Sequence, residues 1–65
     1  MRIEVNGTPR DIAATTLEAA LVELGWAEAR VATALNGDFV PSAARAAQIL
    51  HEGDRVEVLA PMQGG

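Results

Sequence analysis

Apolar and charged residues alternate at the start of the chain, where residues 1–5 read Met-Arg-Ile-Glu-Val. This period of two predicts a half-buried strand. The pair Asn6-Gly7 follows, and because it accepts positive φ it predicts a hairpin turn. Residues 8–13 then return as a second strand. Pro9 places that strand at an edge of the sheet, because proline has no N–H to donate to a neighbour.

The next segment carries the signals of a helix. Thr15 as N-cap with Glu18 three residues later fits a capping box. Four apolar residues then recur at the spacing of a single helix face, namely Leu17, Ala20, Leu21 and Leu24. Gly25 predicts the C-terminal end of this helix. Trp26 follows directly and is placed to fold back over that end.

The second half of the chain reads as short strands separated by turn signals. Residues 31–36 predict a third strand that ends in Asn36-Gly37, and residues 38–40 predict a short fourth strand closed by Pro41. Residues 42–50 predict a short helix or a collapsed loop.

The end of the chain contains one more strand. Ser42 is the expected cap of the preceding helical turn, and the residues around Gly53 predict a turn. In residues 55–59, Val56 and Val58 share one face of the strand and Leu59 lies on the other.

The order strand, strand, helix, strand, strand, strand predicts an α+β fold with a mixed four- to five-stranded sheet packed on one main helix. We expect residues 1–60 to form this domain. Residues 61–65, Pro-Met-Gln-Gly-Gly, show no periodicity and predict a flexible tail.

Composition narrows the functional classes. A chain of 65 residues forms one small domain, and such domains bury only about 60% of their unfolded surface. That leaves little room for a pocket with several catalytic groups, so we expect a carrier or binding module rather than an enzyme. The chain has no cysteine and one histidine, His51, so we expect no bound metal.

Charge and hydropathy exclude two kinds of partner. The net charge is −4 and the five arginines are spread singly, whereas nucleic-acid binders carry basic clusters. No apolar run approaches the ~20 residues that span a bilayer, and the N-terminus lacks the apolar core of a signal peptide. We therefore expect a cytoplasmic protein that contacts neither nucleic acid nor membrane.

The Gly64-Gly65 pair is the feature that suggests chemistry. Glycines lack Cβ atoms, so such a tail can thread a narrow channel and bring its backbone close to a phosphate. Gly65 then supplies the reacting carboxylate, while Gly64 and Gln63 thread the channel. A partner enzyme would supply the catalytic groups. Three apolar residues are candidates for docking that partner, namely Leu59, Met62 and Phe39.

The motifs together resemble the ThiS sulfur carriers. They are Ile3-x-Val5-Asn6-Gly7, Leu17 to Leu24, Ala34-Leu35-Asn36-Gly37-Asp38-Phe39-Val40-Pro41, Gly53-Asp54-Arg55-Val56-Glu57-Val58 and Gly64-Gly65. The resemblance covers essentially the whole chain. One departure is Arg45, which stands amid alanines where many members carry an aromatic residue.

This resemblance implies a ubiquitin-like β-grasp fold without a bound cofactor. It also implies that an activating enzyme of the ThiF or MoeB type uses ATP to adenylate Gly65. Sulfur transfer would then give a thiocarboxylate that delivers sulfur to thiazole synthase in thiamin biosynthesis.

Three alternatives fit the same residues. The chain could be a MoaD-type subunit of molybdopterin synthase, although those chains are usually longer. It could be a ubiquitin-like modifier attached to lysines of other proteins. It could also be a β-grasp interaction domain in which the Gly-Gly pair is incidental.

Overall fold

Five strands and two helical segments make up the described part of the chain. The computed structural model describes residues 1–27 and 29–60. The strands are β1 Arg2–Val5, β2 Thr8–Asp11, β3 Ala32–Leu35, β4 Asp38–Val40 and β5 Arg55–Leu59. The helical segments are α1 Leu17–Glu23 and the 3₁₀ helix η1 Ser42–Ala47.

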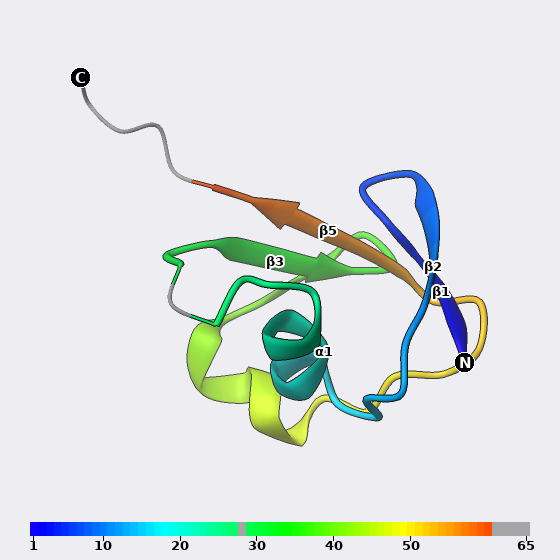
Figure 1. Cartoon of the computed structure of the whole chain (residues 1–65). Helices are drawn as coiled ribbons and strands as arrows, with labels where there is room; N and C mark the ends of the chain where they lie inside the picture. The colour runs from blue at the N-terminus through cyan, green and yellow to red at the C-terminus, as the bar shows by residue number, and fades with distance from the viewer. Residues whose placement is uncertain (28, 61–65) are drawn as a thin grey trace.

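The strands form one mixed sheet in the order β2-β1-β5-β3-β4. β5 is parallel to β1 and antiparallel to β3, and the pairs β1–β2 and β3–β4 are antiparallel hairpins. The last strand therefore lies in the centre, between the two hairpins (Figure 1). β2 is an edge strand that contains Pro9, as predicted.

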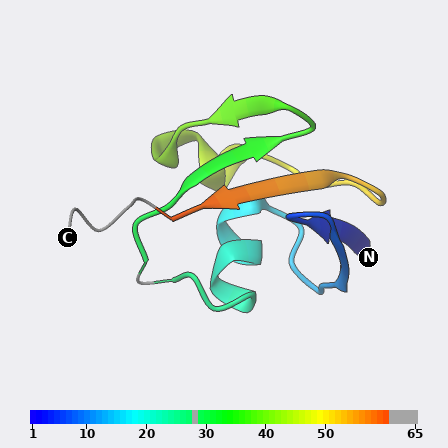
Figure 2. The same ribbon diagram turned by 90° about the horizontal axis from the view of Figure 1, so that it is seen from above.

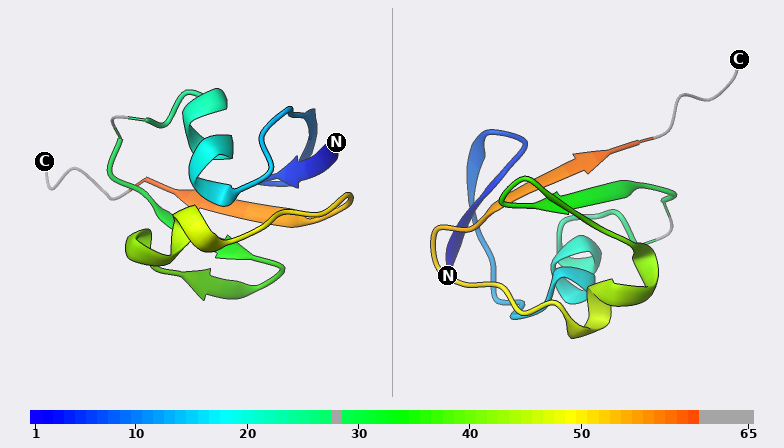
Figure 3. Two further views of the ribbon diagram at one scale, coloured as in Figure 1. Left: turned by 90° about the horizontal axis from the view of Figure 1, so that it is seen from below. Right: turned by 180° about the vertical axis from the view of Figure 1, so that it is seen from behind.

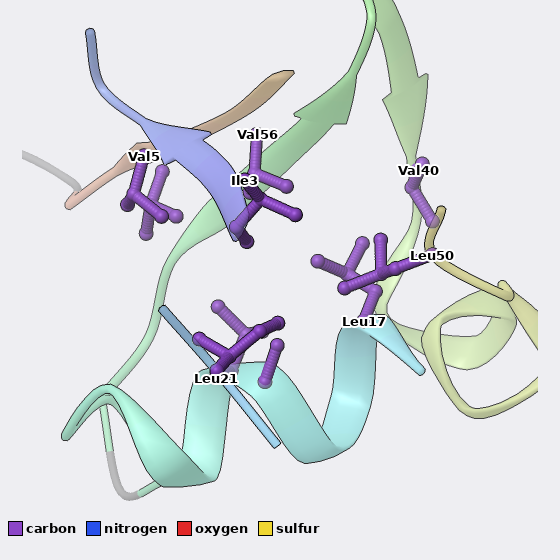
Figure 4. Close-up of a cluster of buried hydrophobic side chains, with 10 residues drawn as sticks. Ile3, Val5, Leu17, Leu21, Val40, Leu50 and Val56 are labelled. Atoms are coloured by element: carbon purple, nitrogen blue, oxygen red, sulfur yellow. The ribbon is translucent and has the colours of Figure 1, made fainter. Parts of the chain in front are cut away.

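Both helical segments cover the same face of this sheet. Figure 2 shows the strands in front of α1, and the left panel of Figure 3 shows α1 and η1 together on the near side of the sheet. Alternate strand residues point into the space between, so Ile3, Val5 and Val56 meet Leu17 and Leu21 of α1 (Figure 4). The predicted α+β arrangement of one main helix on a mixed sheet is confirmed.

The start of α1 differs by one residue from the capping box that the sequence suggested. Thr16, not Thr15, is the N-cap, and its hydroxyl accepts a hydrogen bond from the Ala19 N–H at 3.2 Å. A tertiary contact explains this shift of the N-cap. Thr16 forms an isolated β-bridge with Ile49, and this pairing holds Thr16 in the extended backbone of a cap.

The end of α1 is the stop that the sequence predicted. Gly25 has φ +99°, its N–H donates to the Val22 carbonyl, and the Trp26 N–H donates to the Leu21 carbonyl. This pair of hydrogen bonds is a Schellman motif. Trp26 packs half-buried against the core, as predicted.

Two further boundaries differ from the prediction. Ser42 is the first residue of η1 rather than its cap, and Pro41 in the cap position makes no side-chain hydrogen bond. The second strand ends at Asp11 instead of residue 13. The reason is that the N–H groups of Ala13 and Ala14 donate to the Glu23 carboxylate of α1 instead of to a strand.

Candidate functional site

The sheet face opposite α1 carries an apolar surface. It is formed where β3 lies between β4 and β5, because Ala34 pairs with Phe39 and Ala32 pairs with Leu59. Phe39 is 70% exposed and Leu59 is 68% exposed. We call this the open face. It is defined by Ala32, Ala34, Phe39, Glu57 and Leu59.

Two shallow recesses mark this surface. One, of about 110 Å³, is lined by the residues of the open face together with Thr33. The other, of about 330 Å³, is lined by Arg30, Val31, Ala32, Leu59 and Ala60. The second recess lies at the end of β5, directly before residues 61–65. Leu59 borders both recesses, so the apolar surface continues to the start of the Gly-Gly segment.

A charged strip adjoins the open face at the other end of β5. Glu4 of β1 pairs with Arg55 of β5, and both border a recess of about 260 Å³ together with Glu57. The face therefore changes from charged to apolar along β5. Surfaces with an apolar centre and a charged rim are typical of protein–protein contacts.

The predicted site residues have different outcomes. Leu59 lies on the opposite face from Val56 and Val58, as the alternation predicted, and Phe39 shares that face. Met62, Gln63, Gly64 and Gly65 lie outside the described residues. The docking roles of Leu59, Met62 and Phe39 and the reaction at Gly65 therefore stay predictions.

His51 is an exposed loop residue. Its Nδ1 lies 3.9 Å from Oδ2 of Asp54, and its side chain is 78% exposed. Burial raises the pKa of the Asp54 carboxyl, but hydrogen bonds from the Asn36 amide and the His51 N–H outweigh burial and hold this pKa below its usual range. These two hydrogen bonds to Asp54 thus stabilise the turn before β5.

Arg45, which stands in place of an aromatic residue, has a structural role. Its guanidinium donates to the Val31 carbonyl at 2.6 Å and to Oγ1 of Thr33 at 3.0 Å. The Thr33 hydroxyl in turn donates to the Val40 carbonyl at 2.8 Å. This network ties η1 to β3 and β4 from the core side, so Arg45 does not alter the open face.

Residues 1–27 and 29–60 contain no group of three or more acidic or histidine side chains that could hold a metal ion. None of the helices in these ranges is long and apolar enough to cross a membrane. The open face is the candidate site, because its large apolar side chains are exposed and it reaches the end of β5, directly before residues 61–65 in the chain.

Comparison with known proteins identifies the family. The model of the ThiS family matches residues 3–65. The chain belongs to the ThiS family. A solved relative agrees in fold: the crystal structure of a thiamine biosynthesis protein (ThiS) from Geobacter metallireducens has a TM-score of 0.84 at 33% identity, and the alignment covers 100% of both chains. The ubiquitin-like β-grasp fold is thereby confirmed.

A second structure of the Geobacter metallireducens protein also matches, as do two much longer proteins. The solution structure of a thiamine biosynthesis protein from Geobacter metallireducens has a TM-score of 0.79 at 32% identity, covering all of this chain and 88% of that one. Thiazole synthases from Paramagnetospirillum magneticum and Magnetococcus marinus are 36% and 39% identical over 66 aligned positions. The alignments cover 100% of this chain but only 20% of those two curated relatives.

Proposed function

We propose that this chain is a sulfur carrier for the synthesis of the thiazole ring of thiamin. The observation that carries the proposal is the ThiS family match over residues 3–65. Both relatives' names, thiamine biosynthesis protein and thiazole synthase, favour thiamin over the molybdopterin pathway of the MoaD alternative.

The proposed reaction takes place at the Gly65 carboxylate. A carboxylate acylates poorly, because oxide is a poor leaving group. An activating enzyme of the ThiF or MoeB type attaches AMP from ATP to this carboxylate and releases pyrophosphate. Hydrosulfide then attacks the carbonyl carbon and displaces AMP, so that the carrier ends in a thiocarboxylate. If the donor is a persulfide, the attack gives an acyl disulfide, and a thiol must cleave its S–S bond to release the thiocarboxylate. The chain is a co-substrate in both steps and binds no cofactor of its own.

The open face supports the docking of that enzyme. Phe39 and Leu59 are large exposed apolar side chains, and such residues serve as anchors when a partner buries them. Leu59 is the last residue of β5, so an enzyme docked on it lies next to the segment that leads to Gly65. We propose that Met62 extends this contact, while Gln63 and Gly64 thread the channel to the active site.

Intact mass spectrometry tests the proposal. The purified chain is incubated with ATP, a sulfide source and the ThiF-type enzyme of the same cell. We expect a mass gain that corresponds to replacement of one oxygen by sulfur, absent when Gly65 is deleted. If the enzyme modifies another carrier but not this one, the sulfur-carrier proposal is wrong. Attachment to lysines of other proteins would instead favour the modifier alternative.

The thiazole synthase step needs a separate test. The thiocarboxylated chain is added to thiazole synthase, and loss of the sulfur in the presence of its other substrates is followed by the same mass measurement. Sulfur loss to a molybdopterin precursor within a synthase that contains this chain as a subunit, but not with thiazole synthase, would reassign the chain to the MoaD pathway. The mass of the protein isolated from its own cells shows whether Gly65 carries a free carboxylate.

A further inference from the structure

Glu57 is an exposed carboxylate set within the apolar open face. It lies on β5 between the apolar Leu59 and the charged strip, and it pairs with Ala34 of the neighbouring strand β3. Together with Phe39 and Leu59 it lines the same recess.

The Glu57 carboxylate forms no ion pair within residues 1–27 and 29–60. The ion pairs among the described residues are Arg2–Asp11 and His51–Asp54, and no hydrogen bond to the Glu57 side chain occurs there either. Arg55 lies two residues earlier on the same strand face but forms no ion pair with it. An exposed carboxylate that the described residues leave unpaired is available to a partner.

We propose that Glu57 receives a lysine or arginine side chain of the activating enzyme when that enzyme covers Phe39 and Leu59. This inference rests on the proposed function. Any surface that covers both apolar side chains also covers Glu57, because all three border one recess. Burying a carboxylate without a counter-charge is strongly unfavourable, so the matching surface carries a cation beside its apolar contacts.

A second copy of this chain does not meet that requirement. In a two-fold symmetric contact the same patch meets itself, which brings the Glu57 carboxylates of the two copies toward each other over the shared recess. Like charges at such a contact disfavour it. The net charge of −4 also repels a second copy and attracts a basic partner.

The test is a binding titration of the full chain with the ThiF-type enzyme, comparing wild type with E57Q, E57K and E18Q. Glu18 is exposed on α1, in the opposite layer, so E18Q removes the same charge away from the open face. We expect E57Q to weaken binding about tenfold and E57K about a hundredfold at low salt. E18Q should bind like wild type, and E57Q should reduce the salt dependence of binding.

The remaining outcomes separate failure of the docking inference from failure of the proposed function. Equal binding by wild type and E57Q excludes the ion pair, and a sulfur mass gain in the same samples leaves the proposed function standing. If substitution of Glu57 changes only the binding of thiazole synthase, or only self-association, the open face binds that partner instead of the activating enzyme. If the enzyme binds with the expected Glu57 dependence but adds no sulfur, the proposed function fails and the docking inference holds. If it does not bind at all, both fail.

Discussion

The side-chain amide of Asn6 pairs with the backbone of Val58 as a neighbouring strand residue would. Its Nδ2 donates to the Val58 carbonyl at 3.0 Å, and its Oδ1 accepts from the Val58 N–H at 2.8 Å. The regular pairing of β1 with β5 ends at Val5 and Val56, one residue before Asn6 and two residues before Val58. Asn6 thus extends the ladder toward the end of β5 while its own backbone turns away with φ 51°.

Substitution of Asn6 tests this pairing. Asn6→Gly keeps the positive φ but removes both hydrogen bonds, and we expect it to lower the free energy of unfolding by about 1–3 kcal/mol. Asn6→Asp retains the acceptor and loses the donor, so its loss should be smaller unless carboxylate repulsion from the Val58 carbonyl dominates. Urea denaturation measures both. Unchanged stability in Asn6→Gly would show that water replaces the amide without cost.

Substitution of the two adjacent threonines before α1 tests which of them caps the helix. Thr16→Ala removes the hydroxyl that accepts from Ala19 and should cost about 1 kcal/mol. Thr15 is exposed, and Thr15→Ala should change stability by less than about 0.5 kcal/mol. Thermal unfolding followed by circular dichroism compares them. The reverse order would support the original capping box.

Stability should depend on pH through Asp54. Its pKa is lower in the folded chain, so the unfolded chain binds more protons between the folded value and the unfolded value of about 3.9. This contribution is complete above the unfolded pKa and is lost as pH falls through the folded one. In Asp54→Asn, unfolding free energies measured from neutral to acidic pH should fall less steeply in this window. An identical slope would assign the acid sensitivity to other carboxyls.

The Arg45 network predicts coupling between two residues. Arg45→Met removes the donors to the Val31 carbonyl and to Thr33, and we expect a loss of about 1–3 kcal/mol. In a double-mutant cycle with Thr33→Val, the coupling energy should be at least about 0.5 kcal/mol. Additive losses, measured by urea denaturation, would mean that the guanidinium stabilises the chain through its packing instead.

Replacing an exposed apolar side chain by alanine should affect function differently on the two faces of the domain, while the effect on protein stability should be small on both. Phe39 on the open face is 70% exposed and Val22 on α1 is 56% exposed. Either alanine variant should change the unfolding free energy by less than about 1 kcal/mol. Phe39→Ala alone should lower kcat/KM for thiocarboxylation, by about tenfold or more. Equal activity of both variants would place the docking surface elsewhere.

Local chemistry made most elements predictable from sequence. Asn6-Gly7 and Asn36-Gly37 adopt the positive φ that their hairpin turns require, and the apolar spacing from Leu17 to Leu21 marks the buried face of α1. The cap of α1 was misplaced because Thr15 and Thr16 both fit a capping pattern. The choice depends on a contact with Ile49, which is distant in sequence.

The open face was predictable only in part, because it too depends on contacts between residues that are distant in sequence. Alternation along residues 55–59 placed Leu59 opposite the core-facing valines. It could not show that Phe39 and Leu59 lie on the two strands that flank β3 and line one recess. That arrangement depends on the order of the strands. The Glu23 carboxylate of α1 accepts hydrogen bonds from the N–H groups of Ala13 and Ala14. Such a contact between a helix and a preceding loop has no periodic signal.

The central place of β5 has a consequence for folding. The two hairpins, β1–β2 and β3–β4, share no strand pairing with each other and are joined only through this last strand. Pairing of β5 with β1 closes nearly the whole length of the chain into one loop, and such distant contacts form late and slowly. A nascent chain that has not yet released residues 55–59 from the ribosome cannot complete its sheet. Neither the core nor the open face is complete until β5 has joined the two hairpins.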